Sequence, residues 1–222
     1  MTSTTRHRIL GAAALGAAAA MLAGCSFVGT ELDGVTDIET RAVDAFDRIE
    51  VNGSSDVDII VGKQRSVTVT GDTALLDRVR VSVNDGTLSL DGPEGTWGWT
   101  HHDVHYAITV PVLTDLELSG SGEITVTGVD ASALGVELTG SGDIELAGET
   151  EELSLEIDGS GRINASSLAA DSATVAVSGS GDVTVNAAHT LDVDVSGSGD
   201  VTYLGTAKVS TDISGSGEIS AG

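Results

Sequence analysis

The hexapeptide Ser119-Gly-Ser-Gly-Glu-Ile124 decides the fold, because close copies of it return at an almost constant interval through the C-terminal half of the chain. The five further copies start 18 to 20 residues apart and are Thr139-Gly-Ser-Gly-Asp-Ile144, Asp158-Gly-Ser-Gly-Arg-Ile163, Ser178-Gly-Ser-Gly-Asp-Val183, Ser196-Gly-Ser-Gly-Asp-Val201 and Ser214-Gly-Ser-Gly-Glu-Ile219. A fixed period of this length is typical of a solenoid, in which each repeat packs on its neighbours.

The residues on both sides of each hexapeptide alternate between apolar and polar, which is the period of a β-strand. Leu116 and Leu118 precede the first copy, and Ile124 at its end and Val126 continue the alternation. The other copies have equivalent, mostly β-branched residues. Two short strands per 18 to 20 residues make one coil of a parallel β-helix, whose equivalent strands stack at about 4.8 Å. The sequence therefore predicts an all-β solenoid with about 19 residues per coil.

The paired glycines of the hexapeptide mark a bend in each coil. Counting by twos from Leu118, Gly120 and Gly122 fall on the inward parity, whereas Ser119 and Ser121 fall on the outward parity. Glycine tolerates a positive φ and needs no space for a side chain. We therefore expect a corner at each pair, too tight on its inner side for any other residue.

Residues 43–118 show the same chemistry with less regularity. Asn52-Gly-Ser-Ser-Asp-Val57 is a weaker copy of the hexapeptide, and Asn84-Asp85-Gly86 between two alternating segments predicts a tight hairpin turn. The strands expected here are 57–61, 66–70, 79–83, 87–90 and 104–110. We expect this half to be a less regular β start of the same solenoid that caps one end. At the other end, Thr211 and Ala221 are weak core residues and predict a fraying last coil.

Several different motifs occur in this region in a characteristic order, and they accompany the repeats. They are Ala45-Phe46-Asp47-Arg48-Ile49, Asp56-Val57-Asp58-Ile59, Asn84-Asp85-Gly86-Thr87-Leu88 and Tyr106-Ala107-Ile108-Thr109-Val110-Pro111. With these motifs, residues 43 to about 220 resemble the bacterial family described as "putative auto-transporter adhesin, head GIN domain". The resemblance implies a right-handed parallel β-helix-like domain, here 43–222, on exported proteins that are often lipoproteins. It implies no catalytic residues.

The N-terminus carries the features of an export signal. Arg6, His7 and Arg8 precede an apolar run over 9–24 that is short for a membrane span. The run ends in Leu22-Ala23-Gly24-Cys25, which resembles the lipobox of bacterial lipoproteins. We therefore expect 1–24 to be a lipoprotein signal peptide, Cys25 to carry palmitate-like acyl chains, and 25–42 to be a lipid-anchored linker. The expected location is the extracytoplasmic face of the cell membrane; an incidental thiol after an ordinary signal peptide is the alternative.

The composition excludes some classes of function. The 222 residues include 34 acidic and 10 basic side chains, a formal net charge of -24, which would be repelled by nucleic-acid phosphates. A content of 40% hydrophobic residues is too apolar for plain disorder. The partners expected are the membrane and an unidentified protein or glycan, not a nucleic acid.

The acidic residues fall into two columns that the stacking should align. One is the residue two before each hexapeptide: Glu117, Glu137, Glu156, Ala176, Asp194 and Asp212. The other is the fifth residue of each hexapeptide: Glu123, Asp143, Arg162, Asp182, Asp200 and Glu218. Unit charges at about 5 Å repel by roughly 0.8 kcal/mol in bulk water. Calcium bridging the carboxylates would relieve the repulsion; alternatively the carboxylates lie in solvent, which Arg162 in the second column favours.

A glycine-rich connection holds the other candidate site residues. Trp97 and Trp99 are suited to stacking on a sugar or a partner surface, or else they pack over the open end of the solenoid. His101, Asp103 and His105 alternate and could hold zinc or iron, although an exposed loop is the simpler interpretation.

The sequence thus favours an exported, lipid-anchored surface protein that is a binding or structural module, adhesive in the sense of the family, and not an enzyme. No cofactor is required, although calcium is an option. The alternatives are a polysaccharide-active enzyme on a β-helix, which needs unequal carboxylates in a groove, and a calcium-binding envelope protein.

Overall fold

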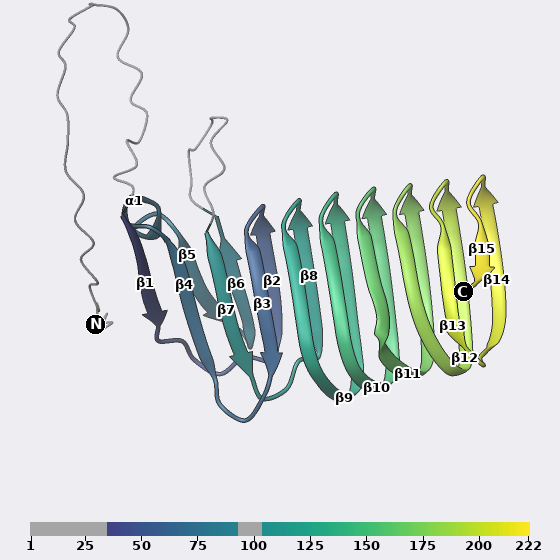
Figure 1. Cartoon of the computed structure of the whole chain (residues 1–222), viewed down its shortest axis with the longest axis horizontal. Coiled ribbons are helices and arrows are strands. Elements are labelled where there is room, and N and C mark those ends of the chain that lie inside the picture. The colour runs from purple at the N-terminus through teal and green to yellow at the C-terminus, as the bar shows by residue number, and fades with distance from the viewer. Residues whose placement is uncertain (1–34, 93–103) are drawn as a thin grey trace, which may run out of the picture.

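The structure is a computed structural model that describes residues 35–92 and 104–222. It confirms the parallel β-solenoid: Figure 1 shows a row of stacked coils whose strands run side by side. The regular strands are β8 (Asp115–Gly120), β9 (Glu123–Gly140), β10 (Asp143–Gly159), β11 (Arg162–Gly179), β12 (Asp182–Gly197), β13 (Val201–Gly205), β14 (Lys208–Gly215) and β15 (Ile219–Ala221). Each long strand supplies the second arm of one coil and the first arm of the next.

The predicted glycine corners are confirmed by the register and by the backbone. The first glycines of successive hexapeptides are partners across the sheet, in the order Gly53, Gly120, Gly140, Gly159, Gly179, Gly197 and Gly215. All seven have a positive φ. A Cβ added to Gly140 would lie 2.3 Å from the carbonyl oxygen of Gly120. The coils therefore approach so closely at the corner that only glycine fits.

The N-terminal half belongs to the same stack, but its coils do not follow the order of the chain. β2 (Arg48–Gly53) and β3 (Asp56–Val61) form a coil whose strands pair in parallel with β8 and β9. On the opposite side of this coil, β6 (Thr87–Asp91) pairs with β2, and β7 (His105–Val110) pairs with β3. The coil nearest the N-terminus in sequence is therefore inserted between two coils that come later.

Antiparallel strands close this end, as the prediction of a cap requires. β4 (Ser66–Asp72) pairs with β7, β5 (Arg80–Asn84) pairs with β6, and α1 (Thr73–Leu76) follows β4. The predicted hairpin turn joins β5 to β6, with φ of 49° at Asp85 and 83° at Gly86. Positive φ at both central residues is the geometry that this kind of turn needs.

The prediction of a linker over 25–42 is wrong for the last part of that range, because β1 (Thr36–Arg41) is a strand that pairs antiparallel with β4. In β1 the burial of side chains is the reverse of what their polarity predicts. Ile38 is 55% exposed, whereas Glu39 is 4% exposed and forms an ion pair of 2.8 Å with Arg41. A search for buried apolar residues at every second position therefore finds no strand here.

One continuous apolar core fills the coils, and its side chains are mainly valine, leucine and isoleucine. Leu118, Ile124 and Leu138 are fully buried, as the strand parity predicts. The last coil is weaker, since Ile213 is 44% exposed and Thr211 and Ala221 are exposed. The prediction that Thr211 and Ala221 are weak core residues is confirmed, and fraying of the last coil stays a prediction.

Candidate functional site

The first predicted acidic column is a real row on the outer face of one sheet, and it is longer than the sequence indicated. Register aligns Glu50, Glu117, Glu137, Glu156, Ala176, Asp194 and Asp212 across neighbouring strands, from β2 to β14. We call these seven positions the acidic row. Glu50 was missed, although it stands two residues before the weaker hexapeptide copy, as Glu117 does before the first full copy.

A shallow groove of about 430 Å³ lies along the N-terminal part of the acidic row. Its lining includes the carboxylates of Glu50, Glu117, Glu137 and Glu156 and the side chain of Arg48. Gly135 opens the groove, because it stands between Asp115 and Ser154 in the adjacent outward row and has no side chain.

The carboxylates in the groove are not equivalent. Glu50 is held in place, with one oxygen accepting a hydrogen bond from Asn52 Nδ2 at 2.9 Å and the other from Ser89 Oγ at 3.3 Å. Partial desolvation raises the pKa of Glu117, and the neighbouring charges of Glu137 and Glu50 raise it further. Glu117 therefore ionises less readily than an isolated glutamate, chiefly because it is partly desolvated.

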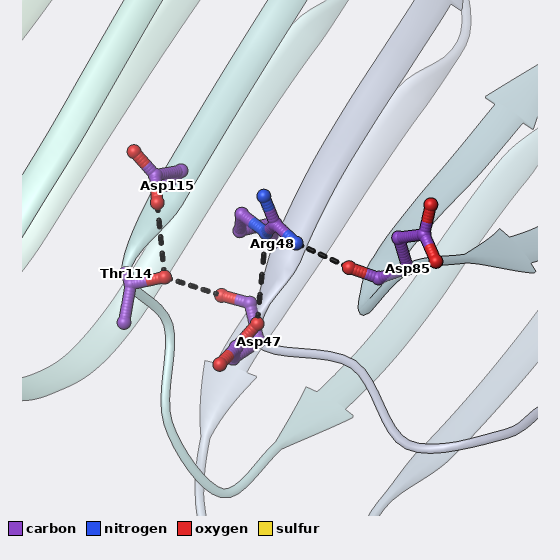
Figure 2. Close-up of polar contacts among 5 residues, drawn as sticks. All are labelled: Asp47, Arg48, Asp85, Thr114 and Asp115. Carbon is purple, nitrogen blue, oxygen red and sulfur yellow. Dashed lines mark hydrogen bonds and ion pairs between the residues drawn. The ribbon is translucent and has the colours of Figure 1, made fainter.

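Polar contacts fix one rim of the groove, where three segments distant in sequence meet (Figure 2). The Arg48 guanidinium donates to the carbonyl oxygen of Asp85 in the hairpin turn and lies 3.8 Å from the Asp47 carboxylate. Thr114 Oγ1 contacts the carbonyl oxygen of Asp47 at 3.2 Å and Asp115 Oδ2 at 3.0 Å. These contacts join the start of β2 to the start of β8 and to the cap.

The second acidic column is neutralised in part, at the two neighbours of Arg162. The guanidinium of Arg162 lies 3.6 Å from an oxygen of Asp143 and 3.9 Å from an oxygen of Asp182, on the two adjacent strands. Within the described residues, no group of three or more His, Cys, Asp or Glu side chains is arranged to hold a metal ion. The columns can therefore attract cationic groups, but they form no preorganised metal cage.

Most of the other predicted site residues lie outside the described part of the chain: Cys25, Trp97, Trp99, His101 and Asp103. His105 is on β7, and its Nε2 is 3.0 Å from Asp58 Oδ2 on the adjacent strand β3. Both side chains are substantially exposed, at 40% and 58%. None of the helices in the described ranges is long and apolar enough to cross a membrane.

These features define a class of protein: a glycine-cornered parallel β-solenoid with an anionic row along one face. The family model described as "putative auto-transporter adhesin, head GIN domain" matches residues 45–207. The chain belongs to this family.

Solved structures agree on the fold. A "putative adhesin" from Bacteroides fragilis superposes with a TM-score of 0.70 at 22% identity, covering 87% of this chain and 100% of that one. A "putative adhesin" from Parabacteroides merdae has a TM-score of 0.57 at 17% identity, with 86% and 97% covered. A "putative lipid binding protein" from Parabacteroides distasonis has a TM-score of 0.52 at 24% identity, with 86% and 98% covered. A comparison with functionally curated proteins gives no significant match.

Proposed function

We propose that the chain is an exported, lipid-anchored surface protein whose solenoid binds a partner without catalysing a reaction. The observation that carries the proposal is the run of carboxylates from Glu50 to Glu156 beside the groove, on a sheet whose register is fixed by the glycine corners. A rigid anionic face attracts a partner that carries basic groups. The family description and the names of the structural neighbours, as adhesins or binding proteins, support a binding role.

Binding should be measured with the chain from Ser26 onward, which contains every described residue, on whole cells and on a glycan array. We expect the variant Glu117→Gln, Glu137→Gln, Glu156→Gln to lose binding. The matched control Glu123→Gln, Glu145→Gln, Asp56→Asn removes three exposed acids that lie on β9, β10 and β3, outside the acidic row. This control should bind as the unaltered protein does. Equal loss in both variants would show that net charge, and not the acidic row, determines binding.

The tryptophan loop is a separate arm of the same experiment. We propose that Trp97 and Trp99 add stacking contacts to the partner, so Trp97→Ala with Trp99→Ala should weaken binding. Unchanged binding by this variant would remove the tryptophans from the proposal and leave the acidic row as the binding surface.

Anchoring depends on Cys25, the one cysteine in the sequence. Cells that take up an alkyne analogue of palmitate should label the protein in the membrane fraction. The Cys25→Ser variant should lose the label and leave that fraction. An unlabelled parent protein would contradict the lipid anchor while leaving the binding proposal intact.

The two alternatives have direct tests. A polysaccharide-active enzyme would use the inequality between Glu117 and its neighbours, and Glu117→Gln would then abolish the release of sugar ends from a polysaccharide panel. A calcium-binding protein would melt at a clearly higher temperature in millimolar calcium chloride than in sodium chloride of matched ionic strength. We expect neither effect.

A further inference from the structure

β1 is the end strand of the sheet order, next to β4. Its six residues pair antiparallel with β4, from Thr36 opposite Asp72 to Arg41 opposite Val67. They precede residues 45–207, which match the family model. A strand edge presents unpaired backbone groups that accept another strand. The β4 edge is therefore an acceptor, filled in this structure by the chain's own β1.

Side-chain packing holds β1 only weakly. Its one buried side chain is the carboxylate of Glu39, paired with Arg41, while Ile38 and the preceding Val35 are 55% and 53% exposed. Arg41 also donates to the carbonyl oxygen of Leu76 at 2.9 Å. Arg41 Nε and Tyr106 Oη are buried, and neither atom has a hydrogen-bond partner among the residues that the structure describes. An element held by backbone pairing and polar contacts, with little apolar burial, belongs to the part of a fold that opens most readily.

The segment that follows β1 can act as a hinge. Residues 42–47 contain no helix or strand, and Phe46 near their end is 4% exposed, with the Arg65 guanidinium 5.5 Å from its ring centroid. β1 can therefore leave β4 while Phe46 keeps the chain fixed to the core. Exchange of such a strand between two copies recreates the same contacts in each, which makes it a route to dimers of low energetic cost.

We propose that β1 exchanges between two copies of this chain, each β1 lying on the β4 edge of the other copy. A second copy is the occupant that fits, because it supplies the same six-residue register and the same Glu39 and Arg41 pair beside Leu76. The exchange is reciprocal, so the dimer is symmetric and closed. This inference goes beyond the proposed function and does not depend on the identity of the ligand.

Engineered cysteines distinguish exchange from a fixed strand. Ile38 and Thr70 are register partners on the outer face, and directly opposed residues have Cβ atoms roughly 5 Å apart, near disulfide range. The chain from Ser26 has no cysteine of its own. Ile38→Cys and Thr70→Cys proteins are mixed, incubated at high concentration and oxidised. The control mixes Ile38→Cys with Thr125→Cys, which is on β9 of the same sheet, three strands from β4.

We expect the first mixture to give several-fold more covalent heterodimer than the control, as measured on non-reducing gels. The chain carrying both Ile38→Cys and Thr70→Cys, oxidised while dilute, should close within itself and then stay monomeric in gel filtration at concentrations where the unaltered chain dimerises. Heterodimer no more abundant than in the control would overturn the proposal. Failure of the double variant to close internally would overturn it as well, because the register would then be wrong.

Discussion

Replacing Gly140 by alanine tests whether contact between neighbouring corners holds the coils in register. Two costs add at this position. The φ of Gly140 is +124°, and a non-glycine residue held in such a region costs about 1–3 kcal/mol. The new Cβ would lie 2.3 Å from the Gly120 carbonyl oxygen, which accepts a hydrogen bond from the Ser141 N–H at 2.9 Å.

That oxygen belongs to backbone and cannot move without breaking the corner, so overpacking adds about 1–3 kcal/mol. The reduced freedom of the unfolded chain returns roughly 0.5 kcal/mol. We expect Gly140→Ala to lower the free energy of unfolding by about 4 kcal/mol. For a domain of this size the melting temperature should fall by about 8–16 °C, since each kcal/mol corresponds to roughly 2–4 °C.

Two other glycines separate the two costs. Gly53 has the same φ of +124°, but a Cβ there would have nothing within 4 Å, so Gly53→Ala reports the backbone cost alone. Gly142 lies outside the positive-φ region, and its Cβ would lie 2.6 Å from both the Gly122 oxygen and Leu118 Cδ2, so Gly142→Ala reports the contact alone. Each should cost about 2 kcal/mol.

The assay is thermal and urea unfolding followed by circular dichroism on the chain from Ser26 onward. Gly62→Ala serves as a near-neutral control, because its φ is ordinary and its Cβ would meet Thr109 Cγ2 at 3.4 Å. If Gly140→Ala unfolds at the same temperature as Gly53→Ala, the close approach of corners contributes nothing and the argument is refuted.

Three further substitutions probe charge. Glu117→Gln should stabilise the protein at pH 7, because the pKa of this carboxyl is raised, so its contribution to stability is present below its unfolded pKa and is lost as pH rises through its folded pKa. The free energy of unfolding, measured from pH 4 to pH 7, should fall less in the variant than in the parent. An unchanged pH profile would contradict this. Arg162→Gln should lower the free energy of unfolding by about 0.5–1 kcal/mol, because Asp143 and Asp182 lose the cation between them. This loss should be smaller in 1 M salt. A loss that does not depend on salt would rule out the electrostatic cause. Glu39→Ala should lower the free energy of unfolding by about 2 kcal/mol, which is less than the loss of a fully buried ion pair because the partner arginine is 25% exposed. Amide hydrogen exchange should become faster in β1 and not in β10. Equally faster exchange in both strands would mean that β1 does not open independently.

The regular coils were predictable because each one obeys local rules. Strand parity alone placed Leu118 and Ile124 inside, and the glycine pair between them marked the corner. Glu50 was also within reach of the sequence. It precedes Asn52 by two residues, and Asn52 aligns with Ser119, so the spacing that identified Glu117 would have extended the row.

Two features could not be obtained from local pattern. The local pattern of the repeat does not specify that β2 lies between β6 and β8, or that β3 lies between β7 and β9. β1 was missed because Glu39 is its buried residue and Ile38 is not. Backbone pairing and the polar contacts of Glu39 and Arg41 hold the strand, so the alternation of apolar and polar residues does not reveal its inward face.

The two acidic columns differ in how the repulsion between their carboxylates is reduced, and this difference indicates where a bound partner would gain the most electrostatic free energy. Parallel stacking places equivalent residues on strands about 4.8 Å apart, and two unit charges at that spacing repel by roughly 0.8 kcal/mol even in bulk water. In the second column Arg162 bridges its two neighbours, and in the acidic row Ala176 interrupts the sequence of charges. The run from Glu50 to Glu156 contains neither a bridging arginine nor an uncharged residue, and it lines the groove. A partner that brings basic groups there removes repulsion as well as forming ion pairs, so Glu117, near the middle of that run, is the first residue to test in binding.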